Sequence, residues 1–124
     1  GTHGSTYGGN PLGCAVAFET TKHILKPNFL STIRKKGHFF KEKLNDLLDI
    51  FPDQIIEVRG KGLMLGLKCA GKNVDLVNMC REEKLLLVTG ASNTVRILPP
   101  LIITNREIEE AVVRLKRVFF KMRK

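Results

Sequence analysis

The sequence of 124 residues contains no tryptophan and only one tyrosine. Many nucleic-acid-binding modules stack bases on aromatic side chains, so this scarcity argues against a nucleic-acid interface. No apolar run reaches the length of a bilayer-spanning helix, which excludes a transmembrane helix from these residues. We therefore expect neither a nucleic acid nor a membrane as a partner.

Cysteine is also scarce. Cys14, Cys69 and Cys80 are odd in number and lie far apart, which argues against a disulfide framework. This pattern is typical of a reducing compartment, and we expect a cytoplasmic location. The spacing lacks the close pairs of zinc sites, so no metal is expected. We interpret all three cysteines as small buried hydrophobic residues.

Positive charge is what the sequence has in excess, with 21 Lys and Arg against 12 Asp and Glu and a net charge of +9. Residues 114–124 hold six basic residues and no acidic one, which leaves 15 against 12 elsewhere. At the end of a helix these cations complement the negative end of the helix dipole. The excess of basic residues leaves one non-enzymatic function open, that of a small basic module that binds a partner without catalysis.

Hydrophobic periodicity and the Gly and Pro positions predict alternating groups of helices and strands. The first helix starts at Asn10-Pro11 and is apolar on nearly every side, so we expect it to be buried all round. The last helix starts with a capping box, Thr104 and Glu107. Helices are expected over 11–26, 29–51, 74–84 and from 104 onward, and strands over 54–59, 62–69, 85–89 and 94–98. This order predicts an α+β fold, within the broader α/β class, with a small, mainly antiparallel sheet covered by helices.

The opening loop is the first candidate site. Gly4-Ser5-Thr6 brings hydroxyls and backbone amides close to the start of the first helix, which suits a phosphate group. The alternative is a tight glycine turn in which Ser5 and Thr6 bond only to their own backbone. His3 lies in the same loop and is the only histidine that we consider for a functional role.

Arg96 is the second candidate. Its apolar neighbours Val95 and Ile97 predict a largely buried strand, and a buried guanidinium needs a carboxylate partner. That partner is either an acidic residue of the protein or an acidic substrate. The segment Gly60–Gly66 does not match a dinucleotide-binding fingerprint, because a strand rather than a helix follows it. We interpret it as a turn and a strand with close backbone approach at Gly66.

Five segments together resemble the class III aminotransferases, which depend on pyridoxal 5'-phosphate, and most resemble the acetylornithine aminotransferase branch. The opening segment Gly-Thr-His-Gly-Ser-Thr-Tyr-Gly-Gly-Asn-Pro-Leu-Gly-Cys-Ala is the most specific of them. The others are residues 59–66, 85–89, 95–101 and 104–108, in the same order and spacing as in the family. The resemblance implies that the chain is the C-terminal part of a fold-type I enzyme.

The resemblance also implies residue roles. Thr6, helped by Ser5, would bind the phosphate of the cofactor held by the neighbouring subunit of a homodimer. Arg96 would bind the α-carboxylate of the substrate. Residues 1–28 would form the cofactor-phosphate loop and the helix leading from a large domain, and residues 29–124 the C-terminal small domain.

The activity implied by the family is amino transfer from N-acetylornithine to 2-oxoglutarate in arginine biosynthesis. Ornithine δ-aminotransferase and succinylornithine aminotransferase remain alternatives. The family's Schiff-base lysine precedes the opening motif, and neither Lys22 nor Lys26 matches its position. We therefore expect no catalytic residue in this chain and no transamination by the 124 residues alone. Residues 90–94 form a loop that differs from that of many relatives, which leaves the amino donor open.

Overall fold

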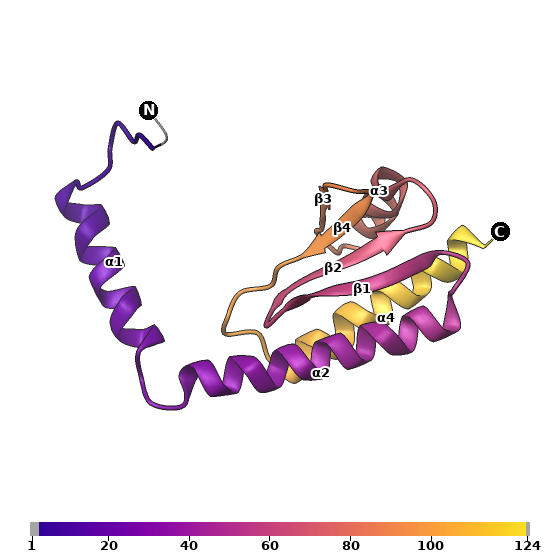
Figure 1. Ribbon diagram of the computed structural model, residues 1–124, viewed down its shortest axis with the longest axis horizontal. Helices are drawn as coiled ribbons and strands as arrows, with labels where there is room; N and C mark the ends of the chain where they lie inside the picture. Colours follow the sequence, from indigo (N-terminus) through magenta and orange to yellow (C-terminus); the bar gives the residue numbers. More distant parts are fainter. Residues whose placement is uncertain (1–2, 124) are drawn as a thin grey trace. The chain divides into compact units, whose positions relative to one another are not determined.

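The computed structural model describes residues 3–123 (Figure 1). The chain divides into two compact units, Gly1–Thr32 and Ile33–Lys124, and helix α2 (Phe29–Ile50) crosses the boundary between them. The sequence analysis divides the chain after residue 28, into a cofactor-phosphate segment and a small domain. Because this division concerns function, it stays a prediction.

Helix α1 (Pro11–Ile24) is the main element of the first unit. As expected, Asn10 caps it, with the side-chain oxygen accepting a hydrogen bond from the Gly13 amide at 2.8 Å, and Pro11 occupies the first turn. The expectation of all-round burial is wrong, because no residue from 3 to 32 is buried. A single helix has no second layer within its own unit, so Leu12, Val16 and other apolar side chains are exposed.

The second unit contains a four-stranded sheet with the order β1-β2-β4-β3, and every neighbouring pair is antiparallel. Its strands are β1 (Ile55–Lys61), β2 (Met64–Cys69), β3 (Val88–Gly90) and β4 (Thr94–Ile97). The first two form a hairpin in which Lys61 pairs with Met64 and Gly62 takes a φ of 57°, a conformation that favours glycine. The strand expected over 85–89 begins only at Val88.

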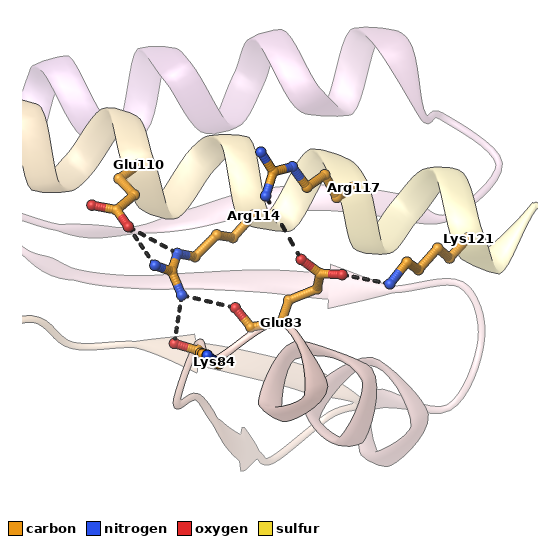
Figure 2. A network of polar contacts seen from close by, with 6 residues as sticks. All are labelled: Glu83, Lys84, Glu110, Arg114, Arg117 and Lys121. Carbon is orange, nitrogen blue, oxygen red and sulfur yellow. Dashed lines mark hydrogen bonds and ion pairs between the residues drawn. The ribbon is translucent and has the colours of Figure 1, made fainter.

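Three helices pack with this sheet: α2, α3 (Asn73–Glu82) and α4 (Asn105–Met122). Helices α2 and α4 run side by side along one face of the sheet (Figures 1 and 2). Alternation along the strands sends one set of side chains into this layer and the other set to the opposite face. The most deeply buried side chains include Phe40, Leu44, Leu47, Phe51, Ile55, Leu67, Leu76, Val95, Ile108, Leu115, Val118 and Phe119. The expected α+β architecture is confirmed.

The expected capping box of α4 is present. The Thr104 hydroxyl accepts from the Glu107 amide at 3.2 Å, and the Glu107 carboxylate accepts from the Thr104 amide at 2.7 Å. The hydrogen bonds from the Thr104 amide and hydroxyl hold the pKa of Glu107 below its ordinary value. The start of α4 is therefore fixed by two reciprocal bonds.

Basic residues in the second half of α4 bind groups outside the helix, at the end of α3. Glu83, just after α3, forms ion pairs with Lys121 and, at 4.0 Å, with Arg117 (Figure 2). Arg114 donates to the backbone carbonyls of Glu83 at 2.9 Å and Lys84 at 3.1 Å. The positive cluster seen in the sequence thus serves in part to join α4 to the end of α3.

Candidate functional site

The sheet face away from α2 and α4 carries the candidate site. Residues paired across the strands form the row Arg59, Gly66, Arg96 and Val88. Because Gly66 has no side chain, this row has a gap between its two arginines. A hollow of about 450 Å³ lies here, and the residues lining it include Arg59, Lys61, Gly66, Thr94 and Arg96.

Arg59 crosses the gap. Its guanidinium in β1 donates to the hydroxyl of Thr94 in β4, with β2 between the two strands. A β-carbon at Gly66 would lie 2.8 Å from the Thr94 methyl carbon and 3.8 Å from the Arg59 Cγ. The group closest to a β-carbon at Gly66 is therefore a side chain rather than the backbone expected from the sequence, and the missing side chain at Gly66 lets Arg59 and Thr94 meet over β2.

Thr94 is held from both ends. Its side chain accepts from Arg59, and its backbone carbonyl accepts from the Asn73 side chain at 3.0 Å. The neighbouring Asn93 donates through its side chain to the carbonyls of Cys69 at 2.9 Å and Gly71 at 2.7 Å. These bonds fix the start of β4, two residues before Arg96.

Arg96 is exposed, whereas its neighbours Val95 and Ile97 are 0% and 4% exposed. The expectation of a buried guanidinium is wrong, because alternation places Arg96 on the open face of the sheet and its neighbours in the core. No ion pair between residues 3 and 123 includes Arg96. Its planar donor fork can therefore bind a carboxylate from outside this chain.

The opening loop leaves its hydroxyls exposed. The turn is closed by backbone and Asn10 contacts: the Gly8 amide donates to the Ser5 carbonyl at 3.2 Å, and the Asn10 side chain donates to the Tyr7 carbonyl at 2.7 Å. Within residues 3–123 neither the Ser5 nor the Thr6 hydroxyl forms a hydrogen bond. Two unengaged hydroxyls beside glycine backbone suit a phosphate ester. His3, in the same loop, is exposed.

The cysteines do not form a site. Cys69 and Cys80 are buried as expected, and burial raises the pKa of the Cys80 thiol to about 12. Cys14 is exposed, so its expected burial is wrong for the same reason as that of α1. Across residues 3–123, no group of three or more His, Cys, Asp and Glu side chains is placed to hold a metal ion. No helix in that range has the length and hydrophobicity needed to cross a membrane.

Two residues of the open face escaped the sequence interpretation. The sequence pattern places Arg59 at the end of one expected strand and Thr94 at the start of another, without assigning a role to either residue. The glycine at position 66 was the available signal, since a glycine within a strand marks a place where other groups approach closely. Only the pairing register shows which groups these are.

The architecture is that of a small antiparallel sheet with an arginine, Arg96, exposed on its open face and in no ion pair within residues 3–123. Comparison with known proteins is more specific. The family model "Aminotransferase class-III" matches residues 1–119, and the chain belongs to this family.

Among curated relatives, acetylornithine aminotransferase 1 of Bradyrhizobium diazoefficiens is 47% identical over 117 residues, which cover 94% of this chain and 29% of that protein. Acetylornithine aminotransferase 2 of Caulobacter vibrioides is 44% identical, over 93% of this chain and 28% of that protein. The chain thus spans less than a third of the length of these relatives.

Solved structures agree on the fold. The acetylornithine aminotransferase of Elizabethkingia anophelis matches with a TM-score of 0.84 and 30% identity, over 98% of this chain and 33% of that one. An ornithine aminotransferase of Toxoplasma gondii, described with partial occupancy of PLP at its active site, matches with a TM-score of 0.81 and 33% identity, over 98% of this chain and 29% of that one.

Proposed function

We propose that this chain is the C-terminal part of a pyridoxal-phosphate-dependent aminotransferase that moves an amino group from N-acetylornithine to 2-oxoglutarate in arginine biosynthesis. Membership of the class III family and the names of the curated relatives support this proposal. The structural observation that carries it is Arg96, exposed and without a carboxylate partner among residues 3–123, on the wall of a hollow of about 450 Å³.

Arg96 is the proposed substrate-binding residue. Both proposed substrates carry an α-carboxylate, and a guanidinium binds a carboxylate through two parallel hydrogen bonds. Arg96 pairs with Gly66 of β2 on one side and with Val88 of β3 on the other. This pairing fixes the position of its backbone in the sheet. Such a fixed donor orients the reacting end of a substrate as well as attracting it.

Ser5 and Thr6 are the proposed cofactor-binding residues. Their exposed hydroxyls, unengaged within residues 3–123, fit the phosphate end of pyridoxal 5'-phosphate. In a homodimer they would bind the phosphate of the cofactor held by the neighbouring subunit, as the family resemblance implies. When bound, this cofactor supplies the electron sink that amino transfer needs.

The 124 residues alone should not transaminate. None of their lysines matches the position of the family's Schiff-base lysine, so the nucleophile that holds the cofactor has no counterpart here. The purified chain, mixed with the cofactor and treated with borohydride, should show no cofactor trapped on a lysine by mass spectrometry. A trapped adduct at one defined lysine would contradict this expectation.

The decisive experiment replaces Arg96 in the intact enzyme. Arg96→Lys keeps the charge but loses the planar fork, so KM for 2-oxoglutarate should rise about tenfold or more. Arg106→Lys, at an exposed position of α4, is the matched control and should leave KM unchanged. An unaltered KM in Arg96→Lys would remove the residue from substrate binding.

The alternative amino donors and the alternative of a non-catalytic binding module are tested by different measurements. Ornithine and succinylornithine are the competing amino donors, and kcat/KM measured with all three separates them. A cytoplasmic location stays a prediction. For a basic binding module without catalysis, salt-dependent binding of mixed-sequence nucleic acid would be the signature.

A further inference from the structure

A second hollow, of about 250 Å³, lies between α2 and the β1–β2 hairpin. Its lining contains four basic side chains and no acidic one. Arg34, His38 and Lys41 come from α2, and Lys61 comes from the end of β1. The rest of the wall consists of Leu65 and three glycines, Gly37, Gly60 and Gly62.

Close packing of the helix on the hairpin brings these basic side chains together. Arg34, His38 and Lys41 are spaced i, i+4 and i+7, so they share one face of α2. Within this stretch, a β-carbon at Gly37 would lie 2.6 Å from the Gly62 carbonyl oxygen. The helix backbone therefore touches the hairpin turn, next to Lys61.

Within the described residues, 3–123, the four basic side chains have no acidic partner. None of them takes part in an ion pair between residues 3 and 123. The end of α4 provides the contrast, since Lys121 pairs with Glu83 and Arg123 with Asp53 at 2.7 Å. Clustered like charges repel, by about 1 kcal/mol for a pair 4 Å apart in water. A bound anion would remove this repulsion.

We propose that this hollow binds a small oxyanion of the phosphate class. A monocarboxylate would neutralise one cation, whereas a phosphate group brings close to two negative charges and several acceptor oxygens to Arg34, Lys41 and Lys61. The volume of about 250 Å³ is below that of pockets for drug-sized ligands, roughly 300–1,000 Å³, and suits a small anion.

The proposed anion site adjoins the proposed substrate site but has cations of its own. The two hollows share Gly60, Lys61 and Leu65, but Arg34 and Lys41 line only the second one. The double variant Arg34→Gln/Lys41→Gln therefore tests the second hollow while leaving the residues around Arg96 in place. Its matched control is Arg106→Gln/Lys116→Gln, which removes the same charge from exposed positions of α4 that line neither hollow.

The experiment titrates the cofactor-loaded intact enzyme with inorganic phosphate in a low-salt buffer and follows binding by calorimetry. We expect one site per chain with a dissociation constant of about 1 mM or lower. In Arg34→Gln/Lys41→Gln the affinity should fall about tenfold or more, with KM for both substrates unchanged. The control double variant should bind phosphate like the parent enzyme.

Three results would overturn the inference. The first is no saturable phosphate binding at millimolar concentration, and the second is an equal loss of affinity in both double variants, which would reflect net charge alone. The third is binding that disappears in Arg96→Gln and persists in Arg34→Gln/Lys41→Gln, since the phosphate would then occupy the substrate hollow. None of these results bears on the KM test of Arg96→Lys, so the two proposals can fail separately.

Discussion

The Arg59 guanidinium of β1 donates a hydrogen bond to the Thr94 hydroxyl of β4, although β2 lies between these strands. The bond is possible because the intervening residue of β2 is Gly66, whose Cα leaves space above the sheet. The bond links β1 and β4, the two strands that pair with β2, on the face that carries Arg96. A contact between side chains thus reinforces the backbone ladder beside the proposed substrate site.

Gly66→Ala should destabilise the chain. The new β-carbon would lie 2.8 Å from the Thr94 methyl carbon, so one of the two groups must move. Overpacking of this kind costs about 1–3 kcal/mol in the free energy of unfolding, measurable by urea denaturation. Gly71→Ala is the matched control, because its β-carbon would meet nothing within 4 Å, and it should stay within about 0.5 kcal/mol of the parent.

A second substitution should rescue the first. Thr94→Ser removes the methyl group that faces Gly66 and keeps the hydroxyl that accepts from Arg59. In the double variant Gly66→Ala/Thr94→Ser, the loss of stability should be smaller than the sum of the two single losses by about 1 kcal/mol. Additive losses would show that the clash is relieved elsewhere.

Acid should weaken the start of α4. Hydrogen bonds from Thr104 lower the pKa of Glu107 in the folded chain, so the unfolded chain binds the proton more tightly. The stability that Glu107 supplies is complete above its unfolded pKa and is lost as pH falls through the lower folded value. Unfolding free energies from about pH 6 down to about pH 3 should therefore fall less steeply in Glu107→Gln than in the parent.

The control for this pH series is Glu109→Gln, which makes the same charge change in the same helix outside the capping box. Thr104→Ala removes the other half of the box and should cost about 1 kcal/mol at neutral pH. An identical slope against pH in Glu107→Gln and the parent would contradict the assignment.

Local signals in the sequence predict much of this fold. The Asn10-Pro11 helix start and the Thr104–Glu107 capping box require only residues a few positions apart, and both are present. The later start of β3 at Val88 and the exposure of Arg96 were not predicted, because strand pairing and the facing of each residue depend on segments far apart in the sequence.

The candidate site was predictable only in part. Arg96, Ser5 and Thr6 were singled out by residue type and by the family resemblance. Arg59 and the basic hollow beside Gly62 were missed, since both depend on which strand or helix lies beside the β1–β2 hairpin. The burial expected for α1 follows from its apolar composition. Composition indicates that an apolar helix face needs a packing partner, but it does not show that these residues contain one.

Thiol reactivity should separate the three cysteines. Cys14 is exposed, whereas Cys69 and Cys80 are buried, and burial raises the pKa of both buried thiols. A thiol-specific disulfide reagent at pH 8 should therefore modify one cysteine of the folded 124-residue chain rapidly and the other two only after denaturation. Mass spectrometry should place the fast modification on Cys14, and Cys14→Ser should abolish it. Rapid labelling of Cys80 in the folded chain would contradict its burial.

Arg114 should matter more for stability than Arg117, although both lie near Glu83. Arg114 donates to two backbone carbonyls at the end of α3, those of Glu83 and Lys84, which have few other partners there. Arg117 reaches the Glu83 carboxylate at 4.0 Å from an exposed position. Arg114→Ala should therefore lower the free energy of unfolding by about 1–3 kcal/mol, and Arg117→Ala by less than about 0.5 kcal/mol. Because both variants lose one positive charge, equal effects would mean that charge, rather than the bonds to the end of α3, determines the contribution of this helix.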